Sequence, residues 1–115
     1  SLNLEMVRGV REAIRNKQPI LIFPEGNWYE DFSPDHKMQD GAAYLARKFN
    51  LKIVPAYIKG ATSWKKNQEV IVVFGESFSP SMEKTREEIS NDISEAITKL
   101  QKQERAMNRE KPETK

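Results

Sequence analysis

The clearest chemical feature of this chain is Glu25, which stands in the motif Phe-Pro-Glu-Gly directly after an apolar run at residues 20–22. The run is rich in isoleucine, a residue enriched in strands. Pro24 has no N–H to give to a ladder, and Gly26 tolerates backbone angles that other residues avoid. We therefore expect the strand to stop abruptly and to present the Glu25 carboxylate at its C-terminal end, the edge at which open α/β sheets bind ligands. The simpler alternative is a solvated or capping carboxylate.

Few other side chains are suited to catalysis or to metal binding. His36 is the single histidine, and the chain has no cysteine. Disulfides, thiolate zinc sites and cysteine nucleophiles are therefore excluded, and His36 alone cannot form a multi-histidine metal site. The five glycines are scattered and form no Gly-rich phosphate loop. We expect neither a metal nor a cofactor.

Length and composition are typical of one small soluble globular domain. The chain has 115 residues, of which 37% are hydrophobic and 31% charged, and its formal net charge is +2. No segment concentrates the basic excess, so the charge gives only weak support for binding to nucleic acid or to an anionic membrane. No apolar run approaches the ~20 residues of a membrane span, and no signal peptide is visible.

The spacing of apolar residues predicts three helices. The first is expected at residues 4–16 and the second at residues 39–49. The third follows Pro80 and ends near Met107. Its apolar positions, which we expect to face the core or a partner, are Ile89, Ile93, Ile97 and Leu100.

Strands are expected at residues 20–23, 53–58 and 70–74, with Pro55 indicating an edge or bulged position in the second. The order helix, strand, helix, strand, strand, helix indicates an α/β domain with a small mixed or parallel sheet of about three strands and flanking helices. We expect residues 1–108 to form this single domain and residues 109–115 to be a frayed polar tail. So thin a sheet suggests that the chain is part of a larger domain.

Three motifs taken together resemble the glycerolipid acyltransferases. Phe-Pro-Glu-Gly at residues 23–26 is followed by Gly-Ala-Ala-Tyr-Leu-Ala at residues 41–46, and then by Ile-Val-Pro-Ala at residues 53–56 before Gly60. Their order and spacing are those of the C-terminal half of a lysophospholipid (1-acylglycerol-3-phosphate) acyltransferase domain. The resemblance covers about residues 4–76 and implies the corresponding half of the glycerol-3-phosphate acyltransferase fold.

The resemblance also implies a function. The family transfers a fatty acyl group from acyl carrier protein or coenzyme A to a lysolipid-type acceptor, in phospholipid biosynthesis or remodelling. The parent enzyme is expected to be cytoplasmic and peripheral to the inner face of the membrane. If half of a larger sheet domain has been removed, self-association is a further expectation.

The resemblance assigns substrate binding but no catalytic residue. Members carry the catalytic base on a His-x4-Asp motif upstream of Phe-Pro-Glu-Gly, and this chain lacks it, since Asp40 is one position too near His36. We therefore expect the chain to be inactive by itself. The implied substrate-binding residues are Phe23, Pro24, Glu25, Gly26, Asn27 and Trp28.

The acceptor site departs from the family pattern at its cations. Asn27 and Trp28 stand where members usually carry Thr-Arg, and Met-Gln-Asp-Gly at residues 38–41 replaces Phe-Lys-Lys-Gly. Arginine and lysine bind phosphate strongly, so phosphate recognition is in doubt. The loop is instead acidic, through Glu30, Asp31, Asp35 and Asp40. An amine-bearing or neutral acceptor becomes more plausible, with a merely solvated acidic loop as the equal alternative.

Aromatic residues in the expected loops suit a membrane interface. Trp64 stands beside two lysines, and a second group of aromatics comprises Trp28, Tyr29 and Phe32. Ordinary packing over a loop is the alternative. The aromatic and basic pattern is too sparse for a nucleic-acid binder, and we expect no nucleic-acid partner. A non-catalytic α/β binding or interaction module remains the alternative to an enzyme.

Overall fold

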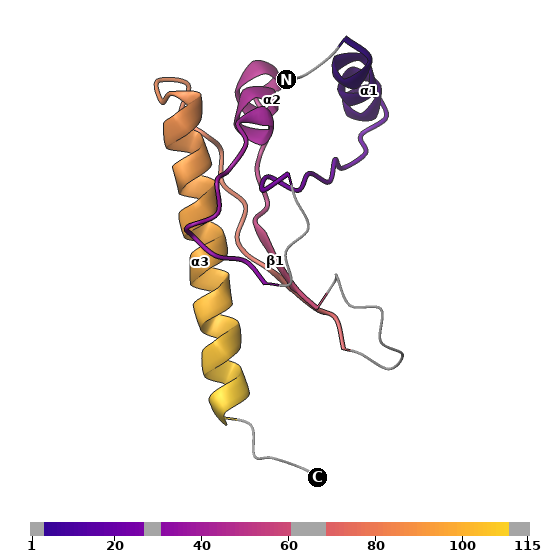
Figure 1. Ribbon diagram of the computed structural model, residues 1–115. Helices are drawn as coiled ribbons and strands as arrows, with labels where there is room; N and C mark the ends of the chain where they lie inside the picture. The colour runs from indigo at the N-terminus through magenta and orange to yellow at the C-terminus, as the bar shows by residue number, and fades with distance from the viewer. Residues whose placement is uncertain (1–3, 27–30, 61–68, 111–115) are drawn as a thin grey trace.

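The computed structural model describes residues 4–26, 31–60 and 69–110 (Figure 1). The helices are α1 (Leu4–Arg15), α2 (Gly41–Phe49) and α3 (Arg86–Glu110), and the strands are β1 (Ala56–Lys59) and β2 (Ile71–Phe74). All three expected helices are confirmed, although α3 begins several residues after Pro80 and continues to Glu110. No helix in the described ranges is long and apolar enough to span a bilayer.

Residues at the helix ends explain where each helix begins or stops. After α1, Lys17 adopts a left-handed φ of 56°, and the N–H of Gln18 donates to the carbonyl of Ala13 at 2.8 Å. After α2, Asn50 also adopts a left-handed conformation, with a φ of 53°, and the chain turns back toward the sheet. Both are Schellman-type ends, which satisfy carbonyls that the helix leaves open. At the start of α3, Thr85 and Glu88 each accept a hydrogen bond from the other's backbone N–H at 3.1 Å, forming a capping box.

The sheet is smaller than expected and antiparallel. β1 and β2 pair antiparallel in the register Ala56↔Phe74 to Lys59↔Ile71, and the described residues hold no third strand. Our expectation of about three strands with parallel pairing is therefore wrong for this structure, whereas the mixed α/β class is confirmed. Residues 20–23 have strand-forming side chains but adopt no regular secondary structure. A strand exists only as the hydrogen-bonded neighbour of another strand, which the described residues do not offer here.

Pro55 lies where the ladder becomes irregular, as its residue type predicted. Its carbonyl accepts from the N–H of Gly75 at 2.9 Å, and beyond it an isolated antiparallel bridge joins Ile53 to Phe78. Between the Ala56↔Phe74 pair and this bridge, the β1 side advances by three positions, from 56 to 53, and the β2 side by four, from 74 to 78. One extra residue opposite Pro55 is the signature of a bulge, where a missing N–H does no harm.

The core forms where α3 crosses the sheet and α2 (Figure 1). Ile89, Ile93, Ile97 and Leu100 are all buried, which confirms the prediction from their spacing. They cluster with Tyr57 of β1, Ala43 of α2 and Phe32. α1 lies apart from this core, beside α2. The Arg11 guanidinium lies 6.0 Å from the centre of the Phe49 ring of α2.

Candidate active site

Residues 23–26 form a tight turn that projects Glu25. The N–H of Gly26 donates to the carbonyl of Phe23 at 3.1 Å, and Gly26 has a φ of +68°, which favours glycine. The carbonyl of Pro24 accepts from the N–H of Gln39 at 2.7 Å, just before α2 begins. The turn is thus tied to the segment that starts α2, and this fixes the direction in which Glu25 leaves the backbone.

The Glu25 carboxylate is paired with His36. Glu25 Oε2 and His36 Nδ1 are in hydrogen-bond contact, and the two side chains are largely buried. A carboxylate accepts hydrogen bonds, so the contact suits the imidazole tautomer that bears its proton on Nδ1. Sequence reasoning dismissed His36 as the base of the family motif and did not foresee this pairing. The ten residues between the two positions carry no periodic signal that would have brought them together.

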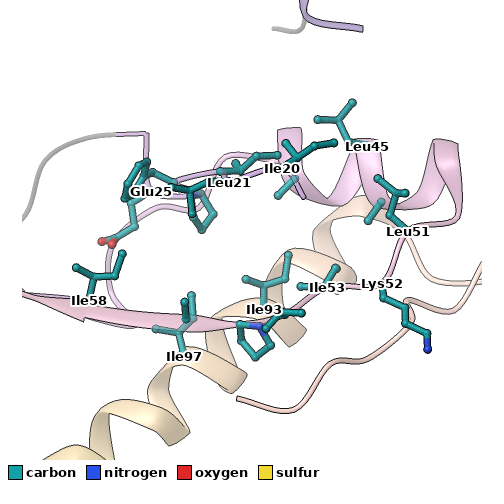
Figure 2. Close-up of a pocket in the computed structure, with 18 of the residues that line it drawn as sticks. Ile20, Leu21, Glu25, Leu45, Leu51, Lys52, Ile53, Ile58, Ile93 and Ile97 are labelled. Atoms are coloured by element: carbon teal, nitrogen blue, oxygen red, sulfur yellow. The ribbon is translucent and has the colours of Figure 1, made fainter. Parts of the chain in front are cut away.

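Glu25 also lies at one end of an apolar cavity of about 220 Å³ (Figure 2). The cavity lies between residues 20–25, α2, residues 51–58 and α3. Figure 2 shows Glu25 and Lys52 at opposite ends, with isoleucine and leucine side chains between them. The apolar lining includes Ile20, Leu21, Leu45, Leu51, Ile58 and Ile93. Such a cavity, with the Glu25 carboxylate at its end, suits an apolar group that carries a polar function.

A second polar cluster holds the loop between Glu25 and α2 against the core. Asp31 Oδ1 accepts from the Tyr57 hydroxyl at 2.6 Å and from Gln101 Nε2 at 3.1 Å, while its Oδ2 lies 3.3 Å from the Arg105 guanidinium. Gln101 Nε2 also donates to the carbonyl of Phe32 at 2.6 Å. We call these four side chains, Asp31, Tyr57, Gln101 and Arg105, the Asp31 clasp. It joins the loop to β1 and α3.

The electrostatics of the clasp favour an ionised Asp31. Burial raises the pKa of the Asp31 carboxyl, but hydrogen bonds from Tyr57, Gln101, the Phe32 N–H and Arg105 outweigh it and leave the pKa below its usual value. Burial, and then the hydrogen bond to Asp31, raise the pKa of the Tyr57 hydroxyl above its usual value. The clasp is therefore a carboxylate that accepts from neutral and cationic donors.

Four of the six residues that sequence analysis assigned to substrate binding lie in the described part of the chain. Phe23, Pro24, Glu25 and Gly26 form the turn at the cavity, whereas Asn27 and Trp28 lie outside the described residues, as do Tyr29, Glu30 and Trp64. Phe32 is buried in the core, so its assignment to an interfacial aromatic group is wrong.

Two acids of the expected acidic loop already have partners within the fold. The Asp31 carboxylate belongs to the clasp, and Asp40 Oδ2 lies 3.4 Å from the Arg86 guanidinium of α3. The Asp40 pair is exposed, so it contributes little to stability. Within the described ranges, no three histidine or acidic side chains gather in a group that could hold a metal ion. Of the acids that the structure describes here, Glu25 is the one that lines the cavity.

Comparison with known protein families agrees with this geometry. Residues 3–59 match the family model described as Acyltransferase. No curated protein and no solved structure matches the chain. The matched stretch contains Glu25, His36 and the whole of β1, while β2 and α3 lie outside it. The match supports a general role in acyl transfer, and residues 3–59 are similar to the acyltransferase family.

Proposed function

We propose that this chain forms the acceptor side of an O-acyltransferase that works at a membrane surface. The enzyme transfers a fatty acyl group from a thioester of acyl carrier protein or coenzyme A to a lysolipid-type acceptor. This is a reaction of phospholipid biosynthesis or remodelling on the cytoplasmic face of the membrane. Glu25, set by the turn at residues 23–26, binds the polar end of the acceptor.

The observation that carries the proposal is the placement of Glu25 at the end of the apolar cavity. A lysolipid joins an apolar chain to a polar head that bears a hydroxyl. A cavity with isoleucine and leucine walls and one carboxylate matches both parts. An apolar cavity of about 150 Å³ accommodates a benzene ring, so the cavity of about 220 Å³ accepts a short stretch of chain. The rest of the lipid's acyl chain then extends out of the open end of the cavity.

The pairing with His36 gives Glu25 a defined role. Acyl transfer from a thioester needs a base for the acceptor hydroxyl and donors for the developing oxyanion. The family base motif is not in this sequence. The imidazole of His36 instead holds one carboxylate oxygen of Glu25 in place. The second oxygen is then directed to accept a hydrogen bond from the acceptor, which it orients without taking its proton.

The charges favour an acceptor without a recognised phosphate. The positions of the usual threonine–arginine pair hold Asn27 and Trp28 here. The cavity lining contains one lysine, Lys52, at the end opposite Glu25. Phosphate binding by this family pattern needs cations beside the carboxylate. An amine-bearing or neutral head suits a carboxylate better.

The test is Glu25→Gln in the full-length protein, assayed by thiol release from an acyl thioester with a lysolipid acceptor. Gln keeps the shape of the side chain and removes its charge. We expect KM for the acceptor to rise roughly tenfold or more, because a charged hydrogen bond contributes about 1.5–3 kcal/mol. KM for the thioester should stay unchanged. Glu76→Gln, an exposed acid outside the cavity, is the matched control. An equal rise for both substrates would contradict an acceptor-side role.

A non-catalytic binding module is the second candidate, and it is favoured by the missing base motif. The 115-residue chain by itself should release no thiol above a heat-treated control. Turnover that His36→Ala abolishes would instead show that the Glu25–His36 pair performs the acid–base chemistry. A full-length protein without turnover would support the binding module.

We also propose that the isolated chain self-associates. Within the part of the chain that the structure describes, each strand of the two-stranded sheet has an unpaired edge, and Val72 and Phe74 of β2 are exposed. Exposed apolar side chains beside open strand edges favour pairing with a second copy. Sedimentation over a range of concentrations should show a dimer or larger species, and replacing Val72 and Phe74 by Thr should shift it toward monomer. A clean monomer at high concentration would contradict this proposal.

A further inference from the structure

α1 carries its charged and apolar residues on different faces. At 100° per residue, Arg8, Arg11 and Arg15 fall on one narrow strip of the helix, next to an apolar arc that contains Met6, Val10 and Ile14. Only Val10 of that arc is buried. Leu4, which falls within the arginine strip, is 66% exposed, and Met6, on the far side of the apolar arc, is 43% exposed. The helix thus shows solvent both an arginine strip and much of its apolar arc.

The fold adds the cations of α2 to this strip. Arg11 of α1 and Lys48 of α2 both lie over the ring of Phe49, at 6.0 and 5.9 Å. Residues 4–17 and α2 together hold six basic residues, Arg8, Arg11, Arg15, Lys17, Arg47 and Lys48, against two acids, Glu5 and Glu12. Their net charge is +4, while the remaining thirteen basic and fifteen acidic residues give –2. The positive charge of the chain is thus concentrated in α1, residues 16–17 and α2, which we call the basic face.

We propose that this basic face, formed by α1 with residues 16–17 and α2, docks on the surface of an anionic lipid bilayer. The proposal rests on the proposed function, because it names the surface through which that enzyme reaches its lipid substrate. Arginines bind lipid phosphates, and the exposed Leu4, which lies among them on the same strip of the helix, enters the interface beside them. The Glu12 carboxylate lies 3.7 Å from Arg15, but both side chains are exposed, so this pair gives way easily.

The basic face also leads toward the cavity. Lys52 follows α2 by three residues and lines the cavity at the end opposite Glu25. Ile20 and Leu21, which follow the turn after α1, line it as well and are exposed. Residues 20 and 21 therefore connect the basic face to the apolar cavity along the chain.

The experiment is co-sedimentation of the chain with lipid vesicles in the absence of any substrate. One set of vesicles is phosphatidylcholine, and the other is phosphatidylcholine with an equal amount of phosphatidylglycerol. We expect binding to the anionic vesicles only, weakening as salt is raised. Arg8→Gln with Arg15→Gln should weaken it roughly 10- to 30-fold, since each basic residue at an anionic surface contributes about fivefold. Lys99→Gln with Lys102→Gln on α3 removes the same charge elsewhere and should leave it nearly unchanged.

The apolar half of the proposal has its own variant, Leu4→Ser, which should also weaken vesicle binding. Circular dichroism checks that each variant keeps its helices. Equal weakening by the α3 control pair, or no binding to anionic vesicles, would overturn the proposal. Arginine-dependent binding to duplex DNA without vesicle binding would assign the basic face to nucleic acid instead. Because no acceptor is present, the result is independent of Glu25→Gln, so either proposal can fail alone.

Discussion

Two regions of the described chain, α3 and residues 20–23, contain similar apolar residues but bury them to different extents. On α3, Ile89, Ile93, Ile97 and Leu100 are at most 7% exposed and form the centre of the core. In the segment at residues 20–23, Leu21 is 73% and Phe23 50% exposed. The family match covers the second region and excludes the first. The acyltransferase segment therefore owes its folded core to residues outside it, while part of its own apolar surface remains uncovered.

This difference teaches that the site is supported from one side. The Asp31 clasp and α3 hold the loop behind Glu25, since Gln101 and Arg105 both come from α3. On the other side, residues 20–23 carry the cavity wall without a strand partner among the described residues. Substitutions on the supported side should lower the free energy of unfolding strongly, because each of its contacts contributes to the core. Substitutions on the open side should change it little.

The largest expected effect is the loss of stability in Ile89→Ala compared with Leu21→Ala. Ile89 is fully buried, so truncation leaves a cavity and should lower the free energy of unfolding by about 2–5 kcal/mol. Leu21→Ala should change it by no more than about 0.5 kcal/mol. Urea unfolding followed by circular dichroism measures both. A comparable loss in Leu21→Ala would show that residues 20–23 are packed in solution, most simply by a second copy of the chain.

The core of α3 could be predicted from sequence because four apolar residues at helical spacing define a face without reference to the rest of the chain. The antiparallel pairing and the absence of a strand at residues 20–23 could not, because strand formation depends on a neighbour. The same difference between local and long-range patterns decides which features of the site could be predicted. Phe-Pro-Glu-Gly forms a local turn, which its residue types predicted, and the structure places this turn at the cavity. The contacts of Glu25 with His36 and of Asp31 with Gln101 join distant positions, and no local pattern encodes them.

A smaller effect is expected when the clasp loses its shortest hydrogen bond. Tyr57→Phe keeps the ring and removes the hydroxyl that donates to Asp31 at 2.6 Å. Because hydrogen bonds to charged groups contribute about 1.5–3 kcal/mol, we expect a loss of that order in unfolding free energy. Tyr44→Phe on α2, whose ring faces Lys48 and Arg86, is the matched control and should change stability little. Equal losses in both variants would remove the special role of the clasp.

The clasp should also appear in the pH dependence of stability. The pKa of Asp31 is lowered in the folded protein, so its ionised form stabilises the fold. That stabilisation is fully present above the unfolded pKa of about 4 and is lost as the pH falls through the folded value. Between pH 5 and strongly acidic solution, the wild-type chain should therefore lose more stability than Asp31→Asn, by chemical unfolding at each pH. Parallel curves for the two proteins would contradict an ionised Asp31 in the clasp.

The smallest effects, of opposite sign, are expected at two glycines, Gly26 in the turn after residues 20–23 and Gly9 in α1. Gly26 has a φ of +68°, and a Cβ there would meet the side-chain amide of Gln39. Gly26→Ala should therefore destabilise the chain by about 1–2 kcal/mol, the usual cost of a left-handed conformation for a residue with a Cβ. Gly9 lies in α1, and a Cβ there would meet nothing within 4 Å. Gly9→Ala should stabilise by about 0.5–1 kcal/mol through helix propensity alone.

The background variant Gln39→Ala separates the two causes at Gly26. Gln39 is exposed and flexible, so its removal should relieve the steric part of the cost while the backbone part remains. Gly26→Ala in that background should still destabilise, because the left-handed φ does not depend on Gln39. Complete rescue would show that the turn itself is unstrained. The acceptor KM then provides a second measurement, because a shifted turn moves Glu25 even where the fold survives. A destabilised Gly26→Ala with unchanged acceptor KM would break the link between this turn and the site.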